Sequence, residues 1–180
     1  MKFNFFELPK DKYKYHELHY VYTSDKLYTL DVTSSADNFS CNFKRTKLET
    51  PYTHDSYDTL YEDYWQDCTA YGVTVDDSDE IVAYLELSRE EWNDRLRITN
   101  LLVKEDLRGL GIGSFLMEKT KEIAQNEDRR IIVLETQSCN VPAIDFYLKH
   151  GFVFCGTNLY FYSNIDKEEN EIMLEMAFLY

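Results

Sequence analysis

The sequence of 180 residues carries 33 acidic and 19 basic side chains, which gives a formal net charge of −14 at pH 7. Such a polyanion repels nucleic acids and anionic membrane surfaces, so neither is expected as a partner. With 44% hydrophobic and 29% charged residues, the composition is that of an ordinary globular protein. The length suits a single domain over residues 1–180.

Cysteine and histidine usage gives no sign of a metal site or of disulfides. The four cysteines stand far apart without a CxxC pair, and the four histidines form no HExxH pattern. The start MKFNFFELPKDKYKY lacks the apolar core of a signal peptide, and no apolar run approaches the roughly 20 residues that span a bilayer. We therefore expect reduced thiols, no metal cofactor and a cytoplasmic location.

The first third of the chain predicts short strands and then a helix. Residues 13–47 are rich in Tyr, Val, Thr and Phe, with turn clusters at residues 23–25 and 34–38. Apolar residues at helical spacing predict an amphipathic helix capped by Asp55 or Ser56. Its expected apolar face consists of Tyr57, Leu60, Tyr61, Tyr64, Trp65 and Cys68.

An acidic segment overlaps this region. Residues 48–88 contain many Asp and Glu residues but no Lys or Arg. Two interpretations stay open: a solvated surface, or the mouth of a site that attracts a cation.

From residue 69 onward the pattern predicts the order βββ–α–β–α–β–β, an α+β domain with a mixed sheet. Short links make the first three strands an antiparallel meander. Asn140 caps the second helix, which has Pro142 in its first turn. Strands are expected at residues 69–75, 81–88, 95–103, 129–136, 152–163 and 171–180, and helices at about 112–125 and 140–150.

Three of the six glycines, Gly109, Gly111 and Gly113, stand at alternate positions just before the first of these helices. Glycine lets successive backbone N–H groups approach an anion, and the dipole at a helix N-terminus favours negative charge. Arg108 adds a cation and Ser114 a hydroxyl donor. Because neither GxGxxG nor GxxxxGK[ST] fits, the segment predicts a different kind of phosphate cradle.

Two motifs resemble the GNAT superfamily of N-acetyltransferases. The segment LRGLGIG (residues 107–113) is similar to the superfamily's acetyl-CoA pyrophosphate motif R/Q-x-x-G-x-G/A. The segment LETQSCNVPAIDFYLKHGF (residues 134–152) is similar to its later signature, in which the matching residues are Asn140, Ala143, Phe146, Tyr147, Gly151 and Phe152. Within the superfamily, the sequence looks most like the streptothricin acetyltransferase group.

The resemblance implies a GNAT-like fold with a mostly antiparallel sheet, splayed at an acetyl-CoA notch between the strands at 95–103 and 130–136, and flanking helices. It also implies a variable substrate-side region at residues 1–67 and an acetyl-CoA-binding core at residues 68–180. The cofactor-binding residues carried over are Leu102, Val103, Arg108, Gly109, Leu110, Gly111, Ile112, Gly113, Ser114, Asn140, Ala143 and Phe146.

Catalytic roles also follow from the resemblance. Tyr147 matches the tyrosine that protonates the leaving CoA thiolate. An acceptor amine must lose a proton to react, and many relatives carry a carboxylate for this purpose on the strand before the glycine loop. Asn100 stands near that position, and an amide cannot act as a base. Two alternatives remain: Glu135 as the base, or a water held by Asn100 with an acid elsewhere.

The function implied is transfer of an acetyl group from acetyl-CoA to a primary amine of a small cationic acceptor, such as an aminoglycoside- or streptothricin-type antibiotic. Acetylation of a polyamine or a protein amine stays open, as does a non-catalytic acyl-CoA-binding module. Relatives leave a homodimer open as well.

Overall fold

The computed structural model describes residues 1–180, and the chain divides into two compact units. Unit 1 comprises Met1–Val21, Asp55–Leu134 and Ala177–Tyr180, and unit 2 comprises Tyr22–His54 and Glu135–Met176. No helix in either unit has the length and apolar character needed to cross a membrane.

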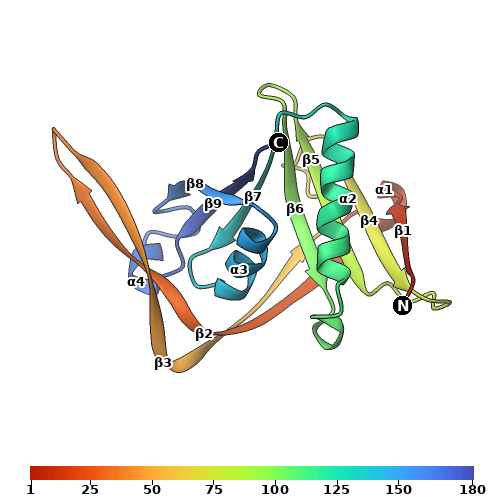
Figure 1. The fold of residues 1–180 in the computed structure, drawn as a ribbon, viewed down its shortest axis with the longest axis horizontal. Coiled ribbons are helices and arrows are strands. Elements are labelled where there is room, and N and C mark those ends of the chain that lie inside the picture. The colour runs from red at the N-terminus through yellow and green to blue at the C-terminus, as the bar shows by residue number, and fades with distance from the viewer. The chain divides into compact units, whose positions relative to one another are not determined.

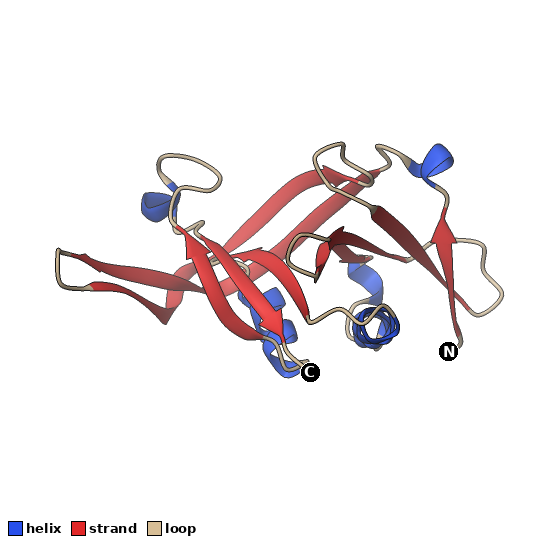
Figure 2. Ribbon diagram, turned by 90° about the horizontal axis from the view of Figure 1, so that it is seen from above, coloured by secondary structure: helices blue, strands red, loops and turns tan.

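Unit 1 is built on antiparallel strands in the order β1-β4-β5-β6. Residues 95–98 of β6 pair in parallel with residues 131–134 of β7, which continues into unit 2. Figures 1 and 2 show α2 lying across one face of these strands. The elements are β1 (Phe3–Leu8), α1 (Lys10–Tyr13), β4 (Cys68–Val75), β5 (Ala83–Glu90), β6 (Arg95–Val103), η1 (Glu105–Leu107), α2 (Ile112–Asn126) and β7 (Ile131–Gln137).

Hydrophobic periodicity explains why these segments fold as they do. Alternate residues of β6 form one buried face: Leu96, Ile98, Asn100 and Leu102. Residues three or four apart form the buried face of α2: Ile112, Leu116, Met117, Thr120 and Ala124.

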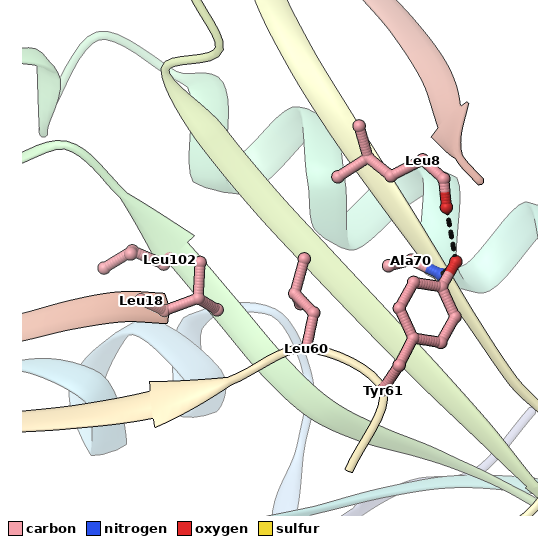
Figure 3. Packing of buried hydrophobic residues seen from close by; sticks show 6 residues of the cluster. All are labelled: Leu8, Leu18, Leu60, Tyr61, Ala70 and Leu102. Carbon is pink, nitrogen blue, oxygen red and sulfur yellow. Dashed lines mark hydrogen bonds between the residues drawn. The ribbon is translucent and has the colours of Figure 1, made fainter. Parts of the chain in front are cut away.

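A compact cluster packs the start of β2 and the chain after β3 against the sheet of unit 1 (Figure 3). Its members are Leu8, Leu18, Leu60, Tyr61, Ala70 and Leu102. The hydroxyl of Tyr61 donates to the carbonyl oxygen of Leu8 at 2.5 Å and accepts from the backbone N–H of Ala70 at 2.9 Å. A single buried tyrosine therefore fixes this segment to both β1 and β4.

Unit 2 combines most of the β2–β3 hairpin with strands in the order β7-β9-β8 and with α3. Within it, the guanidinium of Arg45 on β3 pairs with the carboxylate of Asp145 on α3. The elements, marked in Figure 1, are β2 (Glu17–Ser34), β3 (Phe39–Thr59), α3 (Val141–Lys149), β8 (Val153–Asn158), α4 (Asp166–Glu169) and β9 (Met173–Phe178).

The structure confirms the α+β expectation, with its mixed and mostly antiparallel strands and flanking helices. The meander, α2 and α3 lie where the sequence predicts them. Asn140 caps α3 as expected, since its side-chain oxygen accepts from the backbone N–H of Ala143 at 3.2 Å.

Three predictions are wrong, and one strand was missed. No helix covers residues 55–68, because β3 continues to Thr59 and turns follow it. No turn interrupts residues 23–25, since β2 runs from Glu17 to Ser34. The strand expected at 152–163 ends at Asn158. Strand β1 was not expected at all; its antiparallel pairing with β4, about 70 residues away, leaves no local signal.

Candidate functional site

The glycine segment forms an exposed loop before α2. Gly109 and Gly111 adopt φ values of +80° and +91°, in the left-handed region that favours glycine. A Cβ atom at either position would meet nothing within 4 Å. Backbone conformation, and not crowding, therefore requires these two glycines, and the space beside them is open.

The N-terminus of α2 presents its dipole to this open space. Gly111 is the N-cap, no side chain caps it, and the first turn carries no acidic residue. The first N–H groups of a helix have no partner within the helix. Gly113 lies in the first turn without a positive φ. The geometry fits a phosphate group held by backbone N–H donors.

Other predicted residues of unit 1 lie at the end of β6 and within this loop. Leu102 is buried and Val103 half-buried at the end of β6, while Leu110 is exposed. Arg108 donates from Nε to the carbonyl oxygen of Val103 at 3.1 Å and from Nη1 to that of Val21 at 2.8 Å. The guanidinium therefore links β6 to β2.

The predicted residues Asn140, Ala143, Phe146 and Tyr147 lie in unit 2, on or just before α3. The ring of Tyr147 packs at 5.5 Å from that of Phe146 and at 6.0 Å from that of Phe152, between ring centroids. Burial raises the pKa of Tyr147 to about 12. The hydroxyl is therefore neutral at physiological pH and able to donate a proton.

Glu135 lies half-buried on β7, where its carboxylate accepts a hydrogen bond from the Tyr162 hydroxyl. Burial, with the nearby negative charge of Glu135, raises the pKa of Tyr162 above its ordinary value. The tyrosine therefore stays protonated and keeps donating to the carboxylate. Sequence reasoning missed Tyr162, which has no distinctive spacing in its loop.

A second carboxylate that sequence reasoning missed stands beside Asn100. Glu86 on β5 is opposite Asn100 in the strand register and has no solvent exposure. It accepts from Nδ2 of Asn100 at 3.0 Å, from the Thr99 hydroxyl at 2.6 Å and from the backbone N–H of Tyr61 at 2.5 Å. Asn100 in turn accepts from the Tyr20 hydroxyl at 2.8 Å. Because hydrophobic and polar residues alternate along this strand, the sequence pattern predicts that Glu86 is an ordinary solvent-facing residue.

Several members of the acidic segment form ion pairs with residues outside it. Asp63 lies 2.7 Å from the ammonium of Lys14, and Asp55 lies 2.8 Å from Nε2 of His19. Glu80 pairs with Lys104. These pairs account for part of the segment as ordinary surface.

None of the four cysteines forms a disulfide. No group of three or more His, Cys, Asp or Glu side chains is placed to hold a metal ion.

Comparison with known proteins assigns this architecture to a family. Residues 38–152, more than half of the chain, match the Acetyltransferase (GNAT) family. The chain belongs to this family. It is an acetyl-CoA-dependent N-acetyltransferase, as the two motifs predict.

Relatives and solved structures agree with the assignment. The chain is 34% identical over 126 residues to the streptothricin acetyltransferase of Escherichia coli, and the match covers 70% of each chain. It is 31% identical over 105 residues to that of Streptomyces lavendulae, covering 58% of this chain and 56% of the relative. A crystal structure of nourseothricin acetyltransferase superposes with a TM-score of 0.74 at 25% identity, covering 98% of both chains. A Bacillus anthracis str. Ames protein in complex with acetyl coenzyme A superposes with a TM-score of 0.77 at 22% identity, covering 100% of this chain and 99% of that one; this likeness concerns the fold alone.

Proposed function

We propose that this acetyltransferase acetylates a primary amine of a streptothricin-type antibiotic. The observation that carries the proposal is the 34% identity to the streptothricin acetyltransferase of Escherichia coli over 70% of both chains. Nourseothricin acetyltransferase, which matches over nearly the whole fold, supports the same acceptor class. We also propose that the enzyme works in the cytoplasm and as a homodimer, by resemblance to its relatives.

For acetyl-CoA, the loop from Arg108 to Ser114 is proposed to hold the pyrophosphate with the N-terminus of α2. The two positive φ angles and the uncapped first turn support this role. Leu102 and Val103 would offer backbone groups to the pantetheine. We propose further contacts with acetyl-CoA from Leu110, Ile112, Asn140, Ala143 and Phe146. Residues 68–180 would then form the acetyl-CoA core, and residues 1–67 the part that varies with the acceptor.

For catalysis, acetyl-CoA supplies the thioester carbon and the thiolate leaving group. Tyr147 is proposed to donate a proton to the thiolate, which its raised pKa permits across the physiological range. Glu135 is proposed to accept the proton of the acceptor amine; the alternative is a water held by Asn100 with an acid elsewhere. The Tyr162 hydrogen bond supports a fixed carboxylate orientation at Glu135.

An amine panel tests the proposed acceptor. We expect purified enzyme with acetyl-CoA to release free thiol with streptothricin, and to do so far more slowly with spermidine, an aminoglycoside or an N-terminal peptide amine. Faster release with any of these other amines would contradict the streptothricin assignment. Absence of release with every amine, together with intact acetyl-CoA binding, would favour a non-catalytic acyl-CoA-binding module.

Replacement of Gly113 by alanine tests the phosphate cradle without disturbing the fold. Because Gly113 has no positive φ, alanine fits the helix and raises the free energy of unfolding by at most about 1 kcal/mol. Its methyl group keeps the phosphate from the backbone, so the Kd for acetyl-CoA, measured by calorimetry, should rise about tenfold to 100-fold, the effect of one lost charge-assisted hydrogen bond. Gly156→Ala, where a Cβ would meet only ordinary contacts at 3.6 Å, is the control. Equal acetyl-CoA affinity in both variants would contradict the cradle.

A further inference from the structure

A pocket in unit 1 opens beside the glycine loop, on its β2 side. Its cavity volume is about 390 Å³. The start of β2, the ends of β5 and β6, and η1 contribute its walls. Its lining includes Val103 and Arg108, which places it next to the proposed acetyl-CoA loop. The start of β2 belongs to residues 1–67, which we assign to the acceptor, and β6 belongs to residues 68–180, which we assign to acetyl-CoA. The pocket is therefore lined by both regions.

Aromatic rings on two walls are held in place by hydrogen bonds. The Tyr84 hydroxyl lies 3.2 Å from Nε2 of His16. Nε2 of His19 lies 2.8 Å from Asp55, and the His19 ring stacks on Tyr57 with centroids 4.4 Å apart. Fixed rings give a ligand apolar and π contact at little cost in side-chain entropy.

The basic side chains around the pocket are held by partners, whereas the acidic side chains form no ion pair. Its two basic side chains are engaged: Lys104 pairs with Glu80, and Arg108 donates to two carbonyl oxygens. Its three carboxylates, Glu17, Glu105 and Asp106, are exposed and belong to no ion pair. Since hydrogen bonds to neutral carbonyl oxygens leave the charge of Arg108 in place, the lining keeps a small excess of acidic over basic side chains.

We propose that this pocket binds a cationic group of the acceptor, remote from the amine that is acetylated. Carboxylates beside the fixed Tyr84 ring attract ammonium and guanidinium groups, and a pocket concentrates their field. This inference rests on the proposed function and deepens it. A second positive charge on the acceptor, held here, makes the enzyme selective for polycations over simple amines.

The test neutralises the pocket without changing its shape. The variant Glu17→Gln/Glu105→Gln/Asp106→Asn removes the three unpaired carboxylates. The control Asp11→Asn/Asp77→Asn/Asp79→Asn removes three other exposed carboxylates of unit 1 and so has the same net charge. The probes are streptothricin and acetyl-CoA. Val21→Phe, which narrows the pocket without changing charge, serves as a second pocket variant.

We expect KM for streptothricin to rise about tenfold in the pocket variant, since each of three exposed charge contacts weakens binding by a small factor. The control should keep the KM of the wild type, and Kd for acetyl-CoA should stay the same in all proteins. Raising salt from 0.1 M to 1 M shortens the Debye length from about 10 Å to about 3 Å, so it should raise KM of the wild type more than that of the pocket variant.

Three results would overturn the inference. An unchanged KM for streptothricin in both pocket variants would show that the acceptor does not bind in the pocket. A changed Kd for acetyl-CoA with an unchanged KM for streptothricin assigns the pocket to acetyl-CoA. An equal rise of KM in the pocket variant and the control reduces the effect to net charge.

Failure of the proposed function is recognised separately. If the wild type does not acetylate streptothricin, the proposed function is wrong, and calorimetric titration with streptothricin then decides the pocket. Streptothricin binding that weakens about tenfold in the pocket variant, and not in the control, would support the inference. Absent binding to the wild type, or equal binding to all proteins, overturns it.

Discussion

Replacing Tyr147 by phenylalanine is expected to lower kcat by about 100-fold to 10,000-fold, the usual effect of losing a general acid. The ring contacts with Phe146 and Phe152 remain, because they need no hydroxyl. The free energy of unfolding and the Kd for acetyl-CoA should therefore change little. Steady-state kinetics with the true acceptor measure the loss, and Tyr160→Phe, at a tyrosine that is 58% exposed, is the matched control.

The pH dependence provides a second check on Tyr147. Burial raises its pKa to about 12, so the hydroxyl keeps its proton at every pH below that value. A fall of kcat between pH 8 and 10 in the wild type therefore cannot come from Tyr147. Undiminished kcat in Tyr147→Phe would remove this residue from the mechanism.

Local signals predicted the elements that carry the acetyl-CoA motif. Strand β6 alternates cleanly, and α3 has a capping residue, a proline in its first turn and Gly151 at its end with a φ of +87°. The glycine loop was predicted for two physical reasons that the structure separates. Gly109 and Gly111 supply positive φ, whereas Gly113 lies in the first helical turn without one, and only the proposed close approach of a phosphate calls for glycine there.

The helix expected at residues 55–68 shows why the rest was not predicted. The spacing of Leu60, Tyr61 and Tyr64 fits a helix, yet residues up to Thr59 pair within the long hairpin. After it, Tyr61 is fixed by partners on β1, β4 and β5, which lie up to 53 residues away in the sequence. Tertiary partners override periodicity here, and no local pattern reveals them.

The role of Glu86 could not be predicted for the same reason, because it depends on three hydrogen-bond donors from other segments. Its carboxylate has no solvent exposure and accepts from Tyr61, Thr99 and Asn100. It thereby joins β5, β6 and the chain after β3. It also holds the Asn100 side chain so that its oxygen accepts from Tyr20. Glu86 is thus a positioning residue for a predicted site residue.

Replacing Glu86 by alanine is expected to lower the free energy of unfolding by about 3–5 kcal/mol. Each buried donor left without an acceptor costs about 1–3 kcal/mol. Alanine leaves the Tyr61 N–H without one, while the Thr99 hydroxyl and Asn100 Nδ2 keep only long bonds, to the carbonyl oxygens of Glu86 at 3.3 Å and of Thr59 at 3.5 Å. A loss of this size is a large share of the roughly 5–15 kcal/mol by which domains are stable, so the variant folds marginally or not at all. Denaturant unfolding followed by circular dichroism measures the change.

Glu86→Gln gives a result even if the alanine variant does not fold. Its remaining oxygen can accept from Tyr61, and the Thr99 hydroxyl can rotate to accept, but the new NH₂ group faces that of Asn100. We expect a loss of about 1–3 kcal/mol, between those of the wild type and Glu86→Ala. Glu118→Ala, at an exposed position of α2, should stay within about 0.5 kcal/mol of the wild type. If Glu86→Gln and Glu118→Ala were equally stable, the three hydrogen bonds to Glu86 would not hold these segments together.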